Sequence, residues 1–135
     1  MNKNYHYKSN TNGIEVIVEP EYIDSQSNLF GGIFVWAYHI KINNNSNETV
    51  QLINRHWKIV DEKGTLQEVS GDGAVGEQPI LAPNDNFQYS SGVHLRYPSG
   101  IMAGYYGMKK SNGEIFNVEI PAFSLDVPNL KGTTN

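Results

Sequence analysis

The sequence predicts an all-β protein, folded as a sandwich of seven to eight antiparallel strands. Apolar and polar residues alternate with a period of two along most of the 135-residue chain, which is typical of strands with one buried face. Residues that favour turns recur at short intervals between these segments, and no long segment has the periodicity of a helix.

Residues 34–42 show the alternation most clearly. Five large apolar side chains fall on one face of this segment, and burying each contributes about 1.5–3 kcal/mol before entropy is counted. We therefore expect this face to form the centre of the core: Phe34, Trp36, Tyr38, Ile40 and Ile42. The segments that we predict as strands are residues 14–18, 34–42, 50–61, 66–69, 87–89, 101–108 and 115–120.

Strict alternation divides the side chains of residues 50–61 between two faces. One face carries Ile53, Arg55, Trp57 and Ile59, and the other carries Leu52, Asn54, His56 and Lys58. The asparagine-rich residues 43–47 and the segments 61–64 and 111–113 have turn composition. Tyr105 and Tyr106 are neighbours in a predicted strand, so we expect one ring to be exposed and the other buried.

Length and composition indicate one domain over residues 13–125, with flexible tails at 1–12 and 126–135. The net charge of −4 argues against a nucleic-acid binder, because phosphate contacts need clustered lysine and arginine. The absence of cysteine excludes disulfides, thiolate nucleophiles and thiolate-bound metals. No segment predicts a secretory signal or membrane insertion, so we expect a cytoplasmic protein.

Three glycines, Gly71, Gly73 and Gly76, match the spacing of a dinucleotide-binding fingerprint. That fingerprint requires a helix that opens on the last glycine, because the helix N-terminus holds the pyrophosphate. Here Pro79 and Pro83 follow within a few residues and no helical periodicity is present. The sequence therefore predicts a loop between strands at residues 71–76.

Two interpretations of this glycine loop remain open. Its backbone amides could converge on a phosphate, or the loop could contact a protein partner or serve only to turn the chain. Acidic residues at Asp72 and Glu77 disfavour phosphate. The candidate residues for a phosphate or partner site are Gly71, Gly73, Gly76, Glu77, Arg55, His56, His94 and Arg96.

Catalytic, metal and cofactor sites lack support in the sequence. The four histidines show no local spacing of metal ligands, and no dense group of acidic residues occurs. Ser90-Ser91-Gly92 lacks the strand–turn–helix setting of a nucleophilic serine, and the orienting carboxylate that His94 would need cannot be identified. We expect no catalytic residues, no bound metal and no cofactor.

Several motifs together resemble the ApaG domain family over roughly residues 14–125. They are Arg55-His56-Trp57, the glycine loop that runs into Gly76-Glu77-Gln78-Pro79, Leu81-Ala82-Pro83 and Tyr89-Ser90-Ser91-Gly92. The resemblance implies a fibronectin-III- or immunoglobulin-like β-sandwich. In bacteria it implies an association with cobalt and magnesium efflux or resistance, and in eukaryotes a binding role inside larger proteins.

The sequence thus favours a small, non-catalytic binding or adaptor module that contacts an unidentified protein partner. From the resemblance comes the further expectation that it supports cobalt and magnesium homeostasis indirectly. The alternative is a domain that binds pyrophosphate or a nucleotide through the Gly71–Gly76 loop. The two hypotheses differ in whether an arginine guanidinium reaches the loop to neutralise a phosphate.

Overall fold

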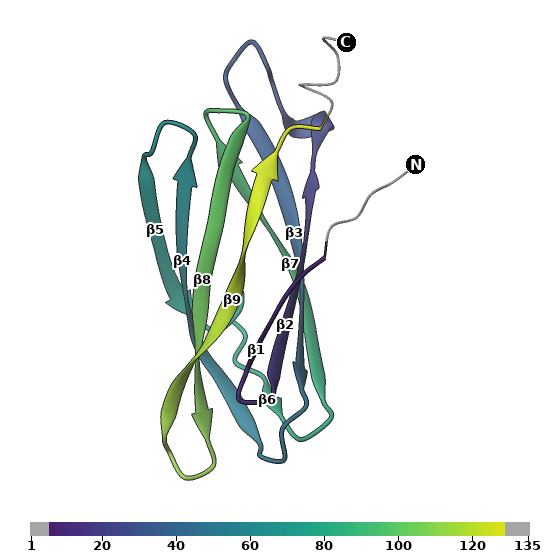
Figure 1. The fold of residues 1–135 in the computed structure, drawn as a ribbon, viewed down its shortest axis with the longest axis vertical. Helices are drawn as coiled ribbons and strands as arrows, with labels where there is room; N and C mark the ends of the chain where they lie inside the picture. The colour runs from purple at the N-terminus through teal and green to yellow at the C-terminus, as the bar shows by residue number, and fades with distance from the viewer. Residues whose placement is uncertain (1–5, 129–135) are drawn as a thin grey trace.

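The computed structural model describes residues 6–128 and shows two antiparallel sheets packed face to face (Figure 1). One sheet has the strand order β1-β2-β3-β7 and the other β5-β4-β8-β9, with the short β6 paired to β4. The nine strands are β1 (Tyr7–Thr11), β2 (Ile14–Tyr22), β3 (Phe34–Asn44), β4 (Val50–Asp61), β5 (Leu66–Asp72), β6 (Ile80–Leu81), β7 (Asn86–Leu95), β8 (Ser99–Lys110) and β9 (Ile115–Asp126). The predicted all-β sandwich is confirmed, with nine strands instead of seven or eight.

The expected N-terminal tail is wrong for residues 7–11, which form β1 and pair with β2 along their whole length. Asn12 and Gly13 connect the two strands with φ values of 51° and 87°. Positive φ at both positions is the requirement of a tight hairpin turn, and Asn-Gly is its strongest sequence signal. At the other end β9 includes Asp126, the first residue of the expected C-terminal tail. Residues 1–5 and 129–135 of the two expected tails lie outside the described residues.

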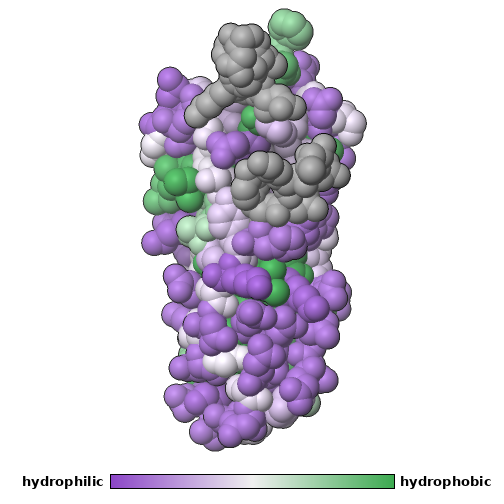
Figure 2. Space-filling view, turned by 45° about the vertical axis from the view of Figure 1, so that its right-hand side comes forward, coloured by the Kyte–Doolittle hydropathy of each residue, from purple (hydrophilic) through white to green (hydrophobic). Residues whose placement is uncertain are grey.

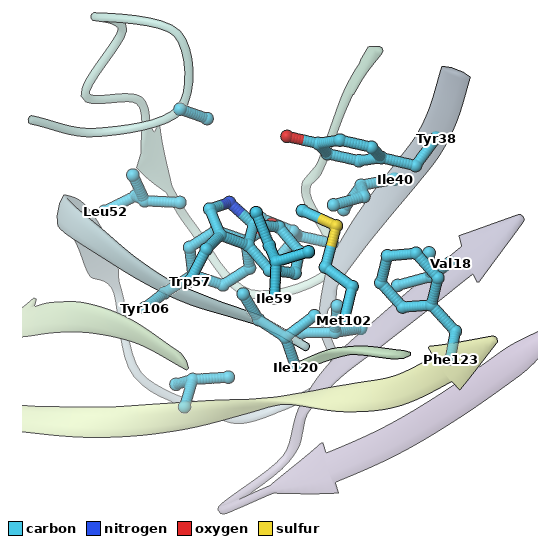
Figure 3. Close-up of a cluster of buried hydrophobic side chains, with 14 of the residues drawn as sticks. Val18, Tyr38, Ile40, Leu52, Trp57, Ile59, Met102, Tyr106, Ile120 and Phe123 are labelled. Atoms are coloured by element: carbon cyan, nitrogen blue, oxygen red, sulfur yellow. The ribbon is translucent and has the colours of Figure 1, made fainter. Parts of the chain in front are cut away.

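The predicted core face of residues 34–42 is confirmed, because all five of its apolar side chains are buried. Tyr38 of β3 meets Trp57 of β4 at a ring-centroid distance of 5.3 Å, and both rings contact Phe123 of β9 at 6.1 and 6.0 Å (Figure 3). These aromatic rings join the two sheets across the sandwich. On the face seen in Figure 2, hydrophilic side chains dominate and hydrophobic ones form separate areas.

A β-bulge changes the side-chain phase of β4. The pairing of β4 with β8 shifts between Leu52 and Asn54, so Ile53 is the extra residue. As a result Leu52 and Trp57 are both buried, although strict alternation assigned them to opposite faces. Beyond the bulge the predicted alternation holds, and Arg55 shares the inward face with Trp57 while His56 lies on the outward face.

Candidate functional site

The glycine loop carries the chain out of β5 and across to β6 (Figure 1). Ala74 and Glu77 exchange two backbone hydrogen bonds, of 2.8 and 3.0 Å, around Val75 and Gly76. Both central residues have positive φ, 51° for Val75 and 85° for Gly76, as in a type I′ turn. Valine is a poor residue for this conformation because its β-branched side chain crowds the left-handed backbone. The loop tip is therefore a strained turn.

The bulge on β4 provides the surface on which this loop docks. The carbonyl of Ile53 accepts hydrogen bonds from the Gly73 amide at 2.7 Å and from Gln78 Nε2 at 2.8 Å. The amide of Leu52 donates to the carbonyl of Pro79 at 3.1 Å. Since the bulge withdraws Ile53 from the ladder with β8, its carbonyl is available to hold the loop.

Arg55 fixes the loop from the inner side. Its Nη1 donates to the carbonyls of Asp72 at 2.7 Å and Gly73 at 3.1 Å. Gly71 is the single glycine of β5 and pairs with Arg55, so it belongs to a strand and not to the expected loop. A Cβ at Gly71 would lie 2.7 Å from Arg55 Nη2, and glycine is therefore required for the guanidinium to pack there. The Arg55 guanidinium does reach the loop, as the phosphate hypothesis requires. It is hydrogen-bonded there to backbone carbonyl groups of the loop.

The loop amides proposed as phosphate donors already have partners. The amide of Gly73 donates to Ile53, and the amide of Gly76 donates to the carbonyl of Asp72 at 3.3 Å. The amide of Glu77 donates to Ala74. A phosphate bound by these groups would require the turn to open, so the phosphate hypothesis stays a prediction that this geometry does not favour.

His56 points away from Arg55, onto the outer face of the five-stranded sheet. Its Nδ1 lies 2.6 Å from Ser70 Oγ, its Nε2 lies 2.8 Å from Glu68 Oε1, and its ring stacks on Tyr105 at 5.2 Å. Ser70 is the direct cross-strand neighbour of His56. The expected exposed tyrosine of the pair 105–106 is Tyr105, whereas Tyr106 is fully buried.

The same arrangement recurs on the outer face of the other sheet. His39 Nδ1 lies 2.6 Å from Ser90 Oγ, and Nε2 lies 2.9 Å from Glu21 Oε1. Ser90 is again the direct cross-strand neighbour of the histidine. Both serine–histidine–glutamate groups therefore follow from strand register, and hydrogen-bonded cross-strand pairs of this kind stabilise sheets.

The last two candidate residues, His94 and Arg96, form no hydrogen bond with the glycine loop among the described residues. His94 belongs to β7, opposite Val35, because this strand extends well beyond the predicted residues 87–89. Arg96 follows the end of β7, and its carbonyl lies next to Gly32 of the β2–β3 loop. That loop carries the exposed apolar side chains of Leu29 and Phe30, which the sequence analysis did not identify. Arg96 therefore lies next to the β2–β3 loop, whereas His94 belongs to β7, which borders the same cavity as the glycine loop.

A cavity of about 320 Å³ lies between the sheets along the edge formed by β5 and β7. Val75 of the strained turn and Arg55 both line it, as does His94. The indole Nε1 of Trp57 is enclosed there without a hydrogen-bond partner among the described residues. The full lining is Tyr38, Arg55, Trp57, Ile59, Gln67, Val69, Val75, Tyr89, Ser91, Gly92, Val93, His94 and Met102.

Three tyrosine hydroxyl groups lie in or beside this cavity. Tyr89 and Tyr106 share a hydrogen bond of 2.6 Å between their hydroxyl oxygens. Burial raises the pKa of Tyr38, Tyr89 and Tyr106, and the positive charge of Arg55 acts in the opposite direction on all three. Sequence alternation identified Tyr38 as a core residue but not as part of a site, because the partner strand β7 was expected to end before Ser91.

Over residues 6–128, no group of three or more histidine, aspartate or glutamate side chains is placed to hold a metal ion. No helix in this part of the chain is long and apolar enough to span a membrane.

Comparisons with known proteins agree with the resemblance noted in the sequence. The ApaG domain matches residues 24–110. Protein ApaG of Brucella canis is 54% identical over 129 residues, covering 96% of this chain and 99% of the relative, and Protein ApaG of Rhizobium etli is 50% identical over the same length. The crystal structure of a Bordetella pertussis protein that is 42% identical matches with a TM-score of 0.83, covering 85% of this chain and 94% of that one. The chain belongs to the ApaG family.

Proposed function

We propose that this chain is a non-catalytic binding module whose partner protein contacts the glycine loop and the free edge of β5. The observation that carries the proposal is Val75. This side chain is 59% exposed at the tip of a turn whose backbone disfavours valine. A residue in a sparsely populated conformation costs about 1–3 kcal/mol, and such residues concentrate at functional sites.

The neighbouring surface supports the same proposal. β5 is the edge strand of its sheet, and Leu66 and Val69 on it are exposed, as is Ile80 just beyond the loop. An edge strand offers unpaired backbone groups to an extended segment of another protein, and apolar side chains beside it add contact area. The partner that fits is therefore an extended peptide segment with apolar side chains.

The variant Val75→Asn tests this proposal without threatening the fold. Asparagine tolerates positive φ, so we expect the variant to be at least as stable as the wild type while it loses the apolar tip. Proteins captured from a cell extract by the wild type should be lost with Val75→Asn and retained with Phe30→Ser, which alters the other exposed apolar loop. Capture that survives Val75→Asn, or that depends only on Phe30, would contradict the proposal.

A second pair of variants checks that the loop conformation itself matters. Gly76 and Gly113 both have positive φ, 85° and 90°, and neither has an atom within 4 Å of an added Cβ. Replacing each with alanine therefore imposes a similar conformational cost, but only Gly76 lies in the glycine loop. Partner capture should decrease for Gly76→Ala and remain unchanged for Gly113→Ala.

The alternative function, binding of pyrophosphate or a nucleotide, has one observation in its favour. The Arg55 guanidinium lies against the loop at Gly71 and Gly73. Titration of the labelled protein with pyrophosphate is the direct measurement. Saturable amide shifts confined to residues 71–79 would support this alternative, whereas unchanged spectra would leave the protein partner as the proposed ligand.

The role in cobalt and magnesium homeostasis implied by the family resemblance is also a proposal. We propose that it is indirect and acts in the cytoplasm through the partner protein. The lack of a metal-ligand group in residues 6–128 supports an indirect role. Addition of Mg²⁺ should then leave the amide spectrum unchanged at concentrations where a specific site would be occupied, and local saturable shifts would argue for direct binding.

A further inference from the structure

The cavity between β5 and β7 is lined by hydrogen-bond donors and lacks acidic groups. Its lining includes the charged side chain of Arg55 but no aspartate or glutamate, although the chain as a whole carries a net charge of −4. A cavity with one arginine and no acidic side chain suits a ligand with negative charge.

Arg55 is the strongest part of this argument. Both of its hydrogen bonds run from Nη1 to backbone carbonyls, and none of the ion pairs among the described residues includes it. A half-buried guanidinium without a carboxylate partner is unusual, because charges removed from water are normally paired. The ligand that would complete the site is an anion with planar geometry, such as a carboxylate.

Trp57 supplies the second, independent observation. The side chain is 2% exposed, and its Nε1 donor has no partner among the described residues. In Figure 3 this nitrogen and the hydroxyl group of Tyr38 are on the same side of the aromatic cluster. A buried donor without an acceptor is destabilising, and native proteins seldom retain one without a reason.

The remaining lining defines the rest of the ligand. Trp57, Met102 and Val75 offer aromatic and aliphatic surface, and about 320 Å³ is at the lower end of the range of ligand pockets, about 300–1,000 Å³. Trp57 Nε1 is enclosed in this structure, so a lining side chain must shift before an acceptor can reach it. Met102 contacts the same space, and its unbranched thioether adapts readily.

We propose that this cavity binds a small organic acid with an apolar body. Its carboxylate accepts hydrogen bonds from Arg55, Tyr38 and, once a lining side chain has shifted, Trp57 Nε1, and its apolar part packs against Met102 and Val75. The cavity shares Val69 and Val75 with the proposed partner surface, but the ligand is held at Arg55 and Tyr38 inside it, so loss of partner capture and loss of ligand binding are separate outcomes.

Indole NMR signals give a direct test. The protein has two tryptophans, and Trp36 Nε1 donates to the carbonyl of Asp126 at 3.0 Å, so its signal is an internal reference. Titration with 3-phenylpropionate should shift the Trp57 indole signal saturably and leave that of Trp36 in place. The uncharged 3-phenylpropionamide should bind at least tenfold more weakly.

Two variants assign the contacts. Tyr38→Phe removes one hydroxyl group and keeps the ring packing, and we expect it to weaken binding about threefold to tenfold. Arg55→Gln should weaken binding at least tenfold, and the unchanged Trp36 signal would establish that the fold persists. Equal binding of acid and amide, or no shift of the Trp57 signal, would overturn the proposal. Shifts by 3-phenylpropionate confined to residues 71–79, without a change at Trp57, would overturn it too, and would show that the acid binds the loop and not the cavity.

Discussion

The two long edges of the sandwich are built differently. At one edge β1 and β9 are joined: Ser9 Oγ donates to the carbonyl of Glu119 at 2.7 Å, and the Glu119 amide donates to Thr11 Oγ1 at 3.1 Å. At the other edge β5 and β7 leave the inter-sheet cavity between them, bordered by the glycine loop. One fold thus has a closed edge, joined by hydrogen bonds, and an open edge that contains a cavity.

The closed edge depends on few specific side chains, because short polar side chains on β1 reach backbone groups of β9 directly. The open edge depends on several unusual features that act together. They are the bulge at Ile53, the glycine at 71 that makes room for Arg55, and the strained turn at Val75. Of these features the turn at Val75 is strained, and backbone strain concentrates at functional sites, so it supports the proposed binding role of the open edge.

Of the changes predicted for the two edges, removal of the Arg55 side chain should destabilise the open edge most. We expect Arg55→Met to lower the free energy of unfolding by about 2–3 kcal/mol, because hydrogen bonds to a charged group contribute about 1.5–3 kcal/mol. Amide hydrogen exchange should accelerate at Gly73 and Gly76, while the Glu119 amide at the closed edge keeps its protection. Chemical denaturation measures the first effect and exchange the second.

Arg96→Met is the matched control for this change. Arg96 is exposed, and no side-chain hydrogen bond or ion pair of it is found among the described residues, so its replacement should alter stability by less than about 0.5 kcal/mol. Equal effects of the two variants would contradict the role of Arg55 in holding the loop.

High pH should weaken the open edge next. Tyr89 and Tyr106 keep their protons in the folded protein above pH 10, because burial raises the pKa of both, whereas the unfolded chain releases them. The unfolded state then binds fewer protons, so stability is full below pH 10 and decreases as pH rises above it. The decrease is up to about 1.4 kcal/mol per pH unit for each group.

The double variant Tyr89→Phe/Tyr106→Phe separates this effect from general alkaline unfolding. It removes both hydroxyl groups of the 2.6 Å pair, so neither is left without a partner. Its free energy of unfolding should depend less steeply on pH between 10 and 11 than that of the wild type. Identical slopes would show that these tyrosines do not carry the dependence.

Sequence patterns predict the closed, regular parts of this molecule better than the open edge. The alternation in β3 identified five buried side chains because nothing interrupts the period of that strand. In β4 the same reasoning misplaced Leu52, because a bulge adds one residue without any glycine or proline to mark it. Asn12-Gly13 is a hairpin signal in the sequence, but the expected flexible tail of residues 1–12 leaves no strand before it.

The candidate site, like the open edge, is only partly predictable from the sequence. Glycine spacing identified the loop, yet Gly71 belongs to β5 and its purpose is to make room for Arg55, a contact between strands that no local pattern contains. His94 and Arg96 are candidates because they could supply positive charge to a phosphate at the loop, and only the extent and register of β7 show that His94 is a strand residue. Tyr38 and Trp57 are core residues, as the alternation predicts. The cavity beside them is lined by residues of both sheets, and its position therefore cannot be predicted from one strand.

The closed edge should respond to mutation moderately. Ser9→Ala and Thr11→Val each remove one hydrogen bond between β1 and β9, so each should lower the free energy of unfolding by about 0.5–1.5 kcal/mol. Exchange of the Glu119 amide should accelerate in Thr11→Val, while the glycine-loop amides remain as protected as in the wild type. Faster exchange at Gly73 in this variant would mean that the two edges are coupled.

The outer-face histidines should have the smallest effect, and they test whether the two sheets differ away from their edges. His39→Gln and His56→Gln each disrupt a serine–histidine–glutamate group, and cross-strand pairs contribute about 0.2–1 kcal/mol. His56 also stacks on Tyr105, so its variant should be the less stable by a few tenths of a kcal/mol. Denaturation of both variants measures the difference. A much larger loss for His56 would assign the outer face of β4 and β5 a structural role beyond strand pairing, and the contrast between the edges would then extend to the whole five-stranded sheet.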